Sequence, residues 1–145
     1  MADTNPAAWT TASLFRALAA PDYADSFDVD RIDGAQPVLA VRMKQYGDLP
    51  ILVTAGEEQI VVATLLWPVD EQENAAEFNS FLLRAQRLIP LSNFAITNVD
   101  GREYYELMGE LSAESRLATI VQELTVLAEN AMAAAGELRE AFAAR

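Results

Sequence analysis

The chain has 145 residues, 52% of them hydrophobic, and this length is typical of a single domain with a substantial core. Its net charge of −12 argues against unaided binding to nucleic-acid phosphates or anionic lipid surfaces, which favour clustered Lys and Arg. It contains no cysteine and no histidine, which excludes disulfides, thiolate chemistry, zinc fingers and Ser-His-Asp triads.

The N-terminal segment does not have the pattern of a signal peptide. Residues 1–8 contain Asp3 and Pro6 and lack a basic region followed by an apolar stretch, and we expect them to be disordered. The longest apolar run, Ile60 to Val69, is much shorter than the roughly 20 residues that a helix needs to cross a bilayer. We therefore expect a cytoplasmic protein that does not insert into a membrane.

The first half of the chain predicts a short helix followed by strands. The helix begins near Thr10, a favoured N-cap residue, and ends before Pro21. The apolar pattern then changes to a period of two, and glycine-containing turns separate the segments, which predicts an antiparallel meander. Its four strands are Phe27–Ile32, Val38–Tyr46, Leu49–Ala55 and Gln59–Trp67.

The fourth of these strands is apolar without alternation from Ile60 to Trp67. A continuous apolar strand is typical of a central position with both faces covered, and Leu65 is accordingly expected in the core. The chain's own helices can cover one face. A second copy of the chain is the expected cover of the other, which predicts a homodimer.

The second half of the chain predicts a helix, a hairpin and another helix. Asn74 and Glu77 have the spacing of a capping box, and apolar residues that include Phe81 then recur at helical spacing up to Pro90. Asp100-Gly101 is a favoured turn pair, flanked by the predicted strands Asn93–Asn98 and Arg102–Met108. After Gly109, Ser112 introduces a third helix, whose apolar stripe runs from Leu117 to Ala128.

Together these elements predict an α+β fold in the order α-β-β-β-β-α-β-β-α. We expect three helices and an antiparallel sheet of about five to six strands, in a single domain over residues 1–145. Residues 131–145 are rich in alanine and are predicted to form a helical tail, whose loss the fold should tolerate better than loss of Leu117 to Leu127.

No residue is predicted to be catalytic, cofactor-binding or metal-binding. Asp28, Asp30 and Asp33 are similar to an acidic calcium loop, but Ile32 occupies the place of a third ligand. No pair among the 22 acidic residues stands out, and no partner serine marks Lys44 as a base. We therefore expect a protein without enzymatic activity.

The residues predicted to contact a partner are aromatic, charged or bulky residues outside the clearest apolar stripes. One aromatic residue, two arginines of the second helix and three bulky residues of the tail are predicted to bind a protein partner: Trp67, Arg84, Arg87, Met132, Leu138 and Phe142. Core packing of the aromatic residues and solvation or local pairing of the arginines are the alternatives.

Several segments together resemble the YjfI-like family of uncharacterised bacterial proteins, from about Trp9 to Asn130. They are Val41-Arg42-Met43 through Leu49-Pro50-Ile51, Pro90-Leu91-Ser92-Asn93-Phe94, Tyr105-Glu106-Leu107-Met108-Gly109-Glu110-Leu111-Ser112, and the helix with Glu123, Leu127, Ala128 and Asn130. The resemblance implies a cytoplasmic role in an envelope-stress module, beside a phage-shock-type helical coat protein. The order of elements is also similar to that of type III secretion chaperones, with one additional strand here.

The leading hypothesis is thus an acidic, dimeric, non-catalytic protein that binds or regulates a protein partner in a bacterial stress response. One alternative is a chaperone-like protein that binds an extended client, as export chaperones do. The other is an enzyme that depends on carboxylates alone. An exposed apolar groove would favour the chaperone-like alternative, and a cleft with converging acids of perturbed pKa would favour the enzyme.

Overall fold

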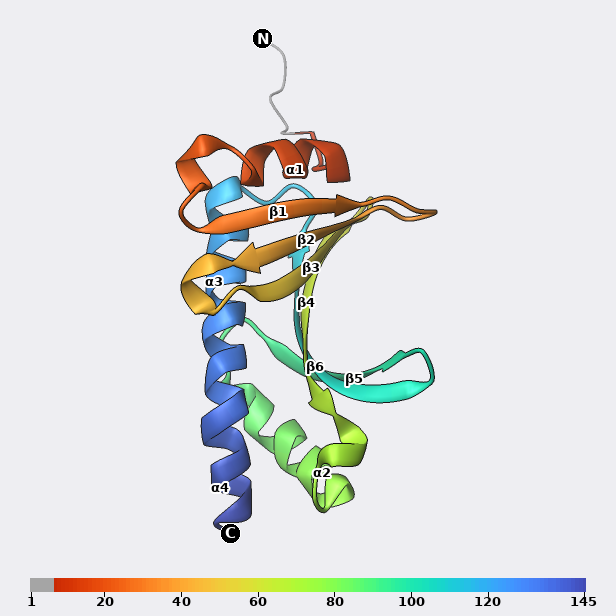
Figure 1. Ribbon diagram of the computed structural model, residues 1–145, viewed down its shortest axis with the longest axis vertical. Helices are drawn as coiled ribbons and strands as arrows, with labels where there is room; N and C mark the ends of the chain where they lie inside the picture. Colours follow the sequence, from red (N-terminus) through yellow and green to blue (C-terminus); the bar gives the residue numbers. More distant parts are fainter. Residues whose placement is uncertain (1–6) are drawn as a thin grey trace.

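The computed structural model describes residues 7–145, which form a six-stranded antiparallel sheet with helices packed against it (Figure 1). The α+β class and the predicted order of elements are confirmed. Of the segment predicted to be disordered, residues 1–6 lie outside the described residues. The elements are α1 (Thr11–Leu18), β1 (Phe27–Ile32), β2 (Val38–Met43), β3 (Leu49–Ala55), β4 (Gln59–Pro68), α2 (Ala75–Ala85), β5 (Asn93–Val99), β6 (Arg102–Ser112), α3 (Leu117–Ala133), a π-helical turn (Ala134–Leu138) and α4 (Arg139–Ala143).

The strand order in the sheet is β1-β2-β3-β4-β6-β5. The first four strands form the predicted meander, and β4 lies in the interior of the sheet, as predicted. The chain then forms α2 and returns as the β5–β6 hairpin, in which β6 pairs with β4 so that Val62 lies opposite Gly109. Consequently β1 and β5 are the two edge strands.

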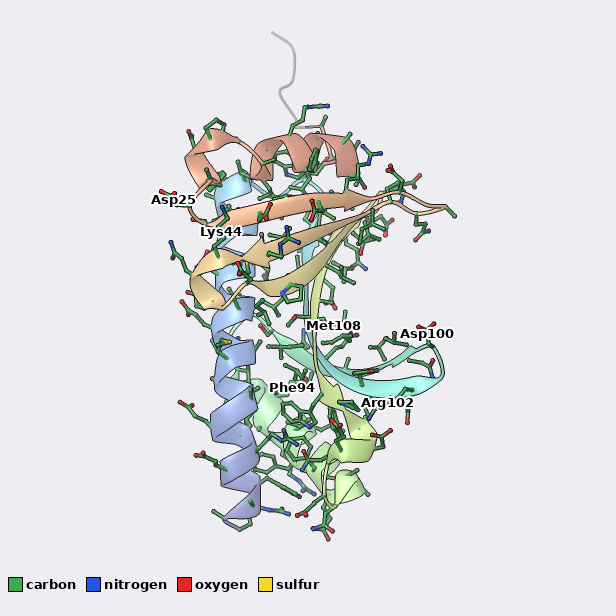
Figure 2. All side chains as sticks on the ribbon, viewed as in Figure 1. Asp25, Lys44, Phe94, Asp100, Arg102 and Met108 are labelled. Atoms are coloured by element: carbon green, nitrogen blue, oxygen red, sulfur yellow. The ribbon has the colours of Figure 1, made fainter. Side chains whose placement is uncertain are left out.

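The tip of the β5–β6 hairpin is the predicted Asp100-Gly101 turn, which projects from the body of the molecule (Figure 2). Both residues have positive φ, 52° and 85°, as a tight hairpin turn of this kind requires. Arg102, at the start of β6, donates a hydrogen bond of 2.7 Å to Asp70 in the loop after β4. This ion pair holds the hairpin against the end of the central strand.

The helix caps differ between the first two helices. Thr10 caps α1 as predicted, because its hydroxyl accepts the Ser13 N–H at 3.0 Å and the Ser13 hydroxyl accepts the Thr10 N–H at 2.9 Å. The capping box predicted for α2 is wrong. Asn74 adopts the left-handed conformation with φ 53°, and its side chain makes no capping hydrogen bond.

The core lies between one face of the sheet and the helices. Its fully buried side chains come from every layer, such as Leu14 of α1, Val62 of β4, Leu107 of β6 and Leu124 of α3. In Figure 1, α1 lies at one end of the sheet and α2 at the other, while α3 and α4 follow one another along the length of the molecule. The single long helix that α3, the π-helical turn and α4 form therefore connects both ends.

The alanine-rich tail contributes buried residues to this core, while the prediction that its loss is tolerated better than loss of Leu117 to Leu127 stays a prediction. Ala131, Ala134 and Phe142 are all less than 9% exposed. The Phe142 ring meets that of Phe78 edge-on, with centroids 5.0 Å apart, and lies 5.6 Å from that of Phe81. The tail thus closes an aromatic cluster at the α2 end of the molecule.

The opposite face of the sheet carries side chains that are only partly buried. Along β4, Ile60, Val62 and Thr64 are buried, whereas Leu65 on the other face is 43% exposed. The prediction that Leu65 belongs to the core is therefore wrong, because the unbroken apolar run of β4 has a core on one side only. Leu52 of β3 lies on the same outer face and is 46% exposed.

Candidate functional site

The last turn of α2 and the connection from α2 to β5 carry exposed apolar side chains. Leu83, Leu88 and Leu91 are 69%, 81% and 53% exposed, although leucine is usually buried. The connection is fixed to the sheet by Gln86, whose side-chain oxygen accepts a hydrogen bond from the backbone N–H of Phe94. Leu83 and Leu91 therefore lie near Asn93 at the start of β5.

An apolar groove of about 210 Å³ lies between α2 and β5. Leu82 and Leu83 form its helical wall, and Phe94 and Ile96 form its strand wall. At its base the Tyr105 hydroxyl donates a 2.6 Å hydrogen bond to the Asn79 side chain, so the polar end of this ring is satisfied. Ile96 remains 44% exposed at the mouth, and the groove can bury an apolar side chain.

The backbone of β5 is an open sheet edge beside this groove. Within the described residues β5 pairs with β6 alone. The Phe94 N–H, which bonds to Gln86, points away from β6. Backbone groups alternate along an antiparallel strand, so those of Ile96 and Asn98 face the same edge as those of Phe94. Phe94 and Ile96 also line the groove, so a segment that paired here would place alternate side chains over it.

The two edges of the sheet differ in charge. Strand β1 carries Asp28, Asp30 and Arg31, and charged residues protect an edge against pairing with another chain. Arg42 of β2 pairs with Asp28 at 2.5 Å and with Asp30 at 3.2 Å, which explains these acids without a metal ion. Strand β5 has the sequence NFAITNV, without charge or proline. It is the less protected edge.

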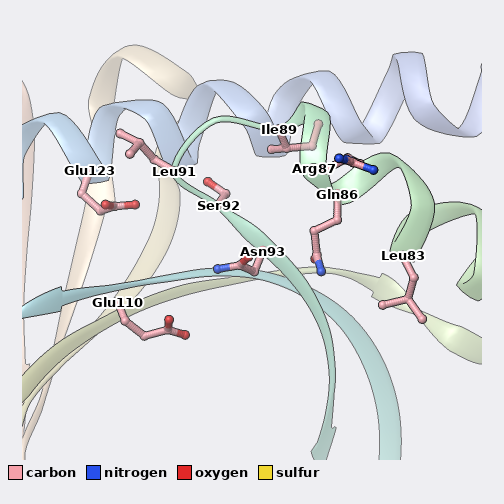
Figure 3. A pocket seen from close by; sticks show the side chains of 9 residues that line it. All are labelled: Leu83, Gln86, Arg87, Ile89, Leu91, Ser92, Asn93, Glu110 and Glu123. Atoms are coloured by element: carbon pink, nitrogen blue, oxygen red, sulfur yellow. The ribbon is translucent and has the colours of Figure 1, made fainter.

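A second, polar pocket of about 560 Å³ lies at the start of β5, and Leu83 lines both it and the groove. Glu123 of α3 and Glu110 of β6 both line it, and in Figure 3 the Glu123 side chain extends toward Ser92, whereas the Glu110 side chain extends from the opposite side of β6. Arg87 also lines the pocket, but its side chain points away from both carboxylates. The apolar walls of this acidic pocket are Leu83, Ile89 and Leu91.

Glu123 is buried although it is acidic. It is 6% exposed, and its Oε2 atom has no hydrogen-bond partner among the described residues. Burial raises the pKa of this carboxyl group above its ordinary value, and the nearby Glu110 raises it further. A buried carboxylate without a hydrogen-bond partner is stabilised by binding a proton or by a cation beside it.

Gly109 makes room for Glu123. A Cβ atom at Gly109 would lie 2.5 Å from Glu123 Oε2 and 3.1 Å from the carbonyl oxygen of Leu91. The strand was predicted to end at Met108, but β6 continues to Ser112 and Gly109 lies within it. The glycine is therefore required for space rather than for a turn.

The residues predicted to bind a partner do not form one surface. Trp67 and Phe142 are 8% and 7% exposed and lie in the aromatic cluster, which fits the alternative of core packing for the aromatic residues. Arg139 covers the Trp67 ring, with its guanidinium 4.2 Å from the ring centroid. Of the other predicted residues, Arg87 lines the acidic pocket, Arg84 and Met132 are exposed, and Leu138 is partly buried against the core.

Sequence reasoning did not identify Leu83, Ile96, Glu110 or Glu123 as site residues. A signal for Ile96 is present, since Asn93 to Val99 is a strand without any charged residue. Glu123 carries a signal too, as a charged residue next to Leu124 within an apolar helical stripe. The proximity of Glu110 to Glu123 depends on the fold alone.

Residues 7–145 lack both a candidate metal-binding cluster and a candidate membrane-spanning helix. This part of the chain has no group of three or more His, Cys, Asp or Glu side chains that could hold a metal ion. Its helices include none with the length and hydropathy that crossing a membrane requires.

The fold and the site define an α+β protein with an uncharged sheet edge beside an apolar groove and an acidic pocket. Over residues 8–142 the chain matches the family described as "Uncharacterized protein conserved in bacteria (DUF2170)", and it belongs to this family. It is 39% identical over 101 residues to the uncharacterized protein YjfI of Escherichia coli strain K12. The aligned residues cover 70% of this chain and 76% of that protein. The family resemblance read from the sequence is confirmed.

One solved structure shares the fold at low sequence identity, and a second is less similar. A crystal structure of an uncharacterized protein from Methanothermobacter thermautotrophicus superposes with a TM-score of 0.58 at 10% identity, covering 82% of this chain and 90% of that one. The crystal structure of the ExsC-ExsE complex gives a TM-score of 0.44 at 14% identity, covering 79% of this chain and 77% of that one. The likeness to the Methanothermobacter protein shows the fold alone. The likeness to the ExsC-ExsE complex is too weak to support a conclusion.

Proposed function

We propose that this chain is a non-catalytic protein-binding protein that captures an extended segment of a partner along β5. The observation that carries the proposal is the uncharged edge of β5 beside an apolar groove, in a sheet whose other edge is charged. An added strand would bond to the backbone of Ile96 and Asn98 and would place alternate apolar side chains over Leu82 and Leu83.

The proposal favours the chaperone-like alternative for the mode of binding. The partner implied by the family resemblance, a phage-shock-type helical coat protein in a cytoplasmic envelope-stress module, is the first candidate to test. It would have to present an extended segment between its helices or at an end of its chain. A partner that binds only as a helix would contradict the mode of binding proposed here.

The test combines capture with hydrogen exchange. Ile96→Lys should place a charge on the edge and reduce capture of the coat protein at least tenfold, because a charged strand edge disfavours pairing. Ile32→Lys is the matched control, since Ile32 is 52% exposed and lies on the other edge strand, β1. In the complex, the amides of Ile96 and Asn98 should become protected from exchange. Protection confined to other elements, or equal capture by both variants, would contradict the proposal.

A carboxylate-dependent enzyme is the second candidate, and Glu123 beside Glu110 is the observation that favours it. The raised pKa of Glu123 suits a general acid, which would need Glu110 as an ionised partner. Hydrolysis of a panel of glycosides, compared between the wild type and Glu123→Gln, tests this candidate. Turnover that the substitution abolishes would establish the enzyme in place of the binding protein.

A further inference from the structure

The acidic pocket contains a polar atom that nothing in the described chain satisfies. Glu123 lines this pocket, and its Oε2 atom is buried without a hydrogen-bond partner. A buried carboxylate without a partner costs free energy, and a positively charged group would compensate that cost. Glu110 of β6 also lines this pocket and supplies a second carboxyl group.

The walls of the pocket are suited to an amphipathic cation rather than to a metal ion. Leu83, Ile89 and Leu91 can pack against methylene groups, while the two carboxylates lie where the charged end would be. A metal ion would favour a closer set of three or more acidic or histidine ligands, which residues 7–145 do not provide. The strongly acidic chain also attracts basic ligands from solution.

We propose that the acidic pocket binds a lysine or arginine side chain of the partner, with its charged end at Glu123 and Glu110. This inference rests on the proposed capture of an extended segment at β5. Because Leu83 lines both the groove and the pocket, one segment can reach both. The partner segment would then carry apolar residues at alternate positions, with a basic residue beyond them at the Asn93 end of β5.

Small cations test the pocket without knowledge of the partner. Butylguanidinium and butylammonium are titrated into the full-length protein at low salt, and butylurea serves as the uncharged analogue of butylguanidinium. We expect saturable shifts of the Gly109 and Ser92 amide signals with the two cations, weakening as salt is added, and no saturable shift with butylurea. Equal responses to the charged and uncharged probes would overturn the proposal.

Substitutions of the two pocket glutamates show whether the cations bind in the acidic pocket. Glu123→Gln and Glu110→Gln should each weaken binding of butylguanidinium at least fivefold, and Glu114→Gln is the control because Glu114 is exposed and outside the acidic pocket. Circular dichroism checks that each variant is folded. Undiminished binding by both pocket variants would overturn the proposal, as would a magnesium or calcium ion that shifts the same signals and is not displaced by butylguanidinium.

The pocket and the β5 edge can fail separately. If the cations do not bind but Ile96→Lys still abolishes capture of the partner, the proposed function stands and the basic residue is excluded. If the cations bind at Glu123 but Ile96→Lys captures the partner as the wild type does, the pocket stands by itself and capture at β5 is excluded.

Discussion

Leu65 and Leu107 lie on neighbouring strands, but their environments differ. Leu107 is fully buried, whereas Leu65 is 43% exposed on the outer face. Leu107→Ala should lower the free energy of unfolding by about 2–5 kcal/mol, the range for truncation of a buried leucine. Leu65→Ala, the matched control, should cost less than about 1 kcal/mol. Urea unfolding of both variants checks this, and equal midpoints would contradict the position of the core.

Glu123 makes stability depend on pH. Its pKa in the folded chain is raised above the ordinary value of 4.5, so the unfolded chain loses this proton at lower pH than the folded chain. The free energy of unfolding therefore falls as pH rises from about 4.5 through the raised pKa, and this part of the stability is fully present only below that interval. Glu123→Gln removes the effect.

The measurement is urea unfolding of wild type and Glu123→Gln at pH 4 and pH 7. The variant should gain stability relative to wild type between the two values. Burial also raises the pKa of Glu106, but this group is present in both proteins, so its contribution is common to both. A difference that does not change with pH would contradict the assignment of a raised pKa to Glu123.

At the scale of single elements, the last helix contributes more than its composition suggests. A chain that ends at Asn130 loses the buried Ala131, Ala134 and Phe142, and we expect it to lose several kcal/mol of stability or not to fold. A chain that ends at Ala143 is the control, because it loses only the exposed Ala144 and Arg145. Thermal unfolding followed by circular dichroism checks the prediction, and equal midpoints for the two chains would contradict it.

The existence of the helices and strands could be read from periodicity, but the role of the tail could not. The bounds of β3 were predicted to the residue, and those of β4 and β5 to within one residue, because alternation and turn residues act locally. Alanine has little side chain to signal burial. Whether Ala131 and Ala134 are covered depends on where α2 packs, and that depends on contacts between segments more than 40 residues apart.

At the scale of the whole molecule, the outer face of the sheet makes dimerisation a specific prediction. Leu52 and Leu65 lie on this face and are about half exposed. An isologous pair of sheets would bury both. Sedimentation equilibrium at tens of micromolar, about the range in which a specific interface holds, should show a dimer for the wild type and a monomer for Leu65→Asp. Leu83→Asp is the control, because Leu83 lies on α2, and dissociation caused by this variant alone would place the interface there.

The order of the strands explains why the candidate site could not be predicted. The meander was readable, but nothing local shows that β6 rather than β5 pairs with β4. That pairing leaves β5 at the edge and brings Glu110 near Glu123 of α3. Residues from separate elements therefore form the acidic pocket, and no spacing along the chain connects them.

The π-helical turn at Ala134–Leu138 has a consequence for the length of the chain. A short π-helical segment within an α-helix accommodates one additional residue locally, without changing the direction of the side chains before and after it. Shortening the chain by one residue within this turn would leave a regular α-helix that still presents Phe142 to Phe78. The same deletion within α3 would rotate every later side chain by about 100° and turn Phe142 away from the core. In the C-terminal helix, the π-helical turn is thus the place where this chain can lose one residue while keeping the same packing.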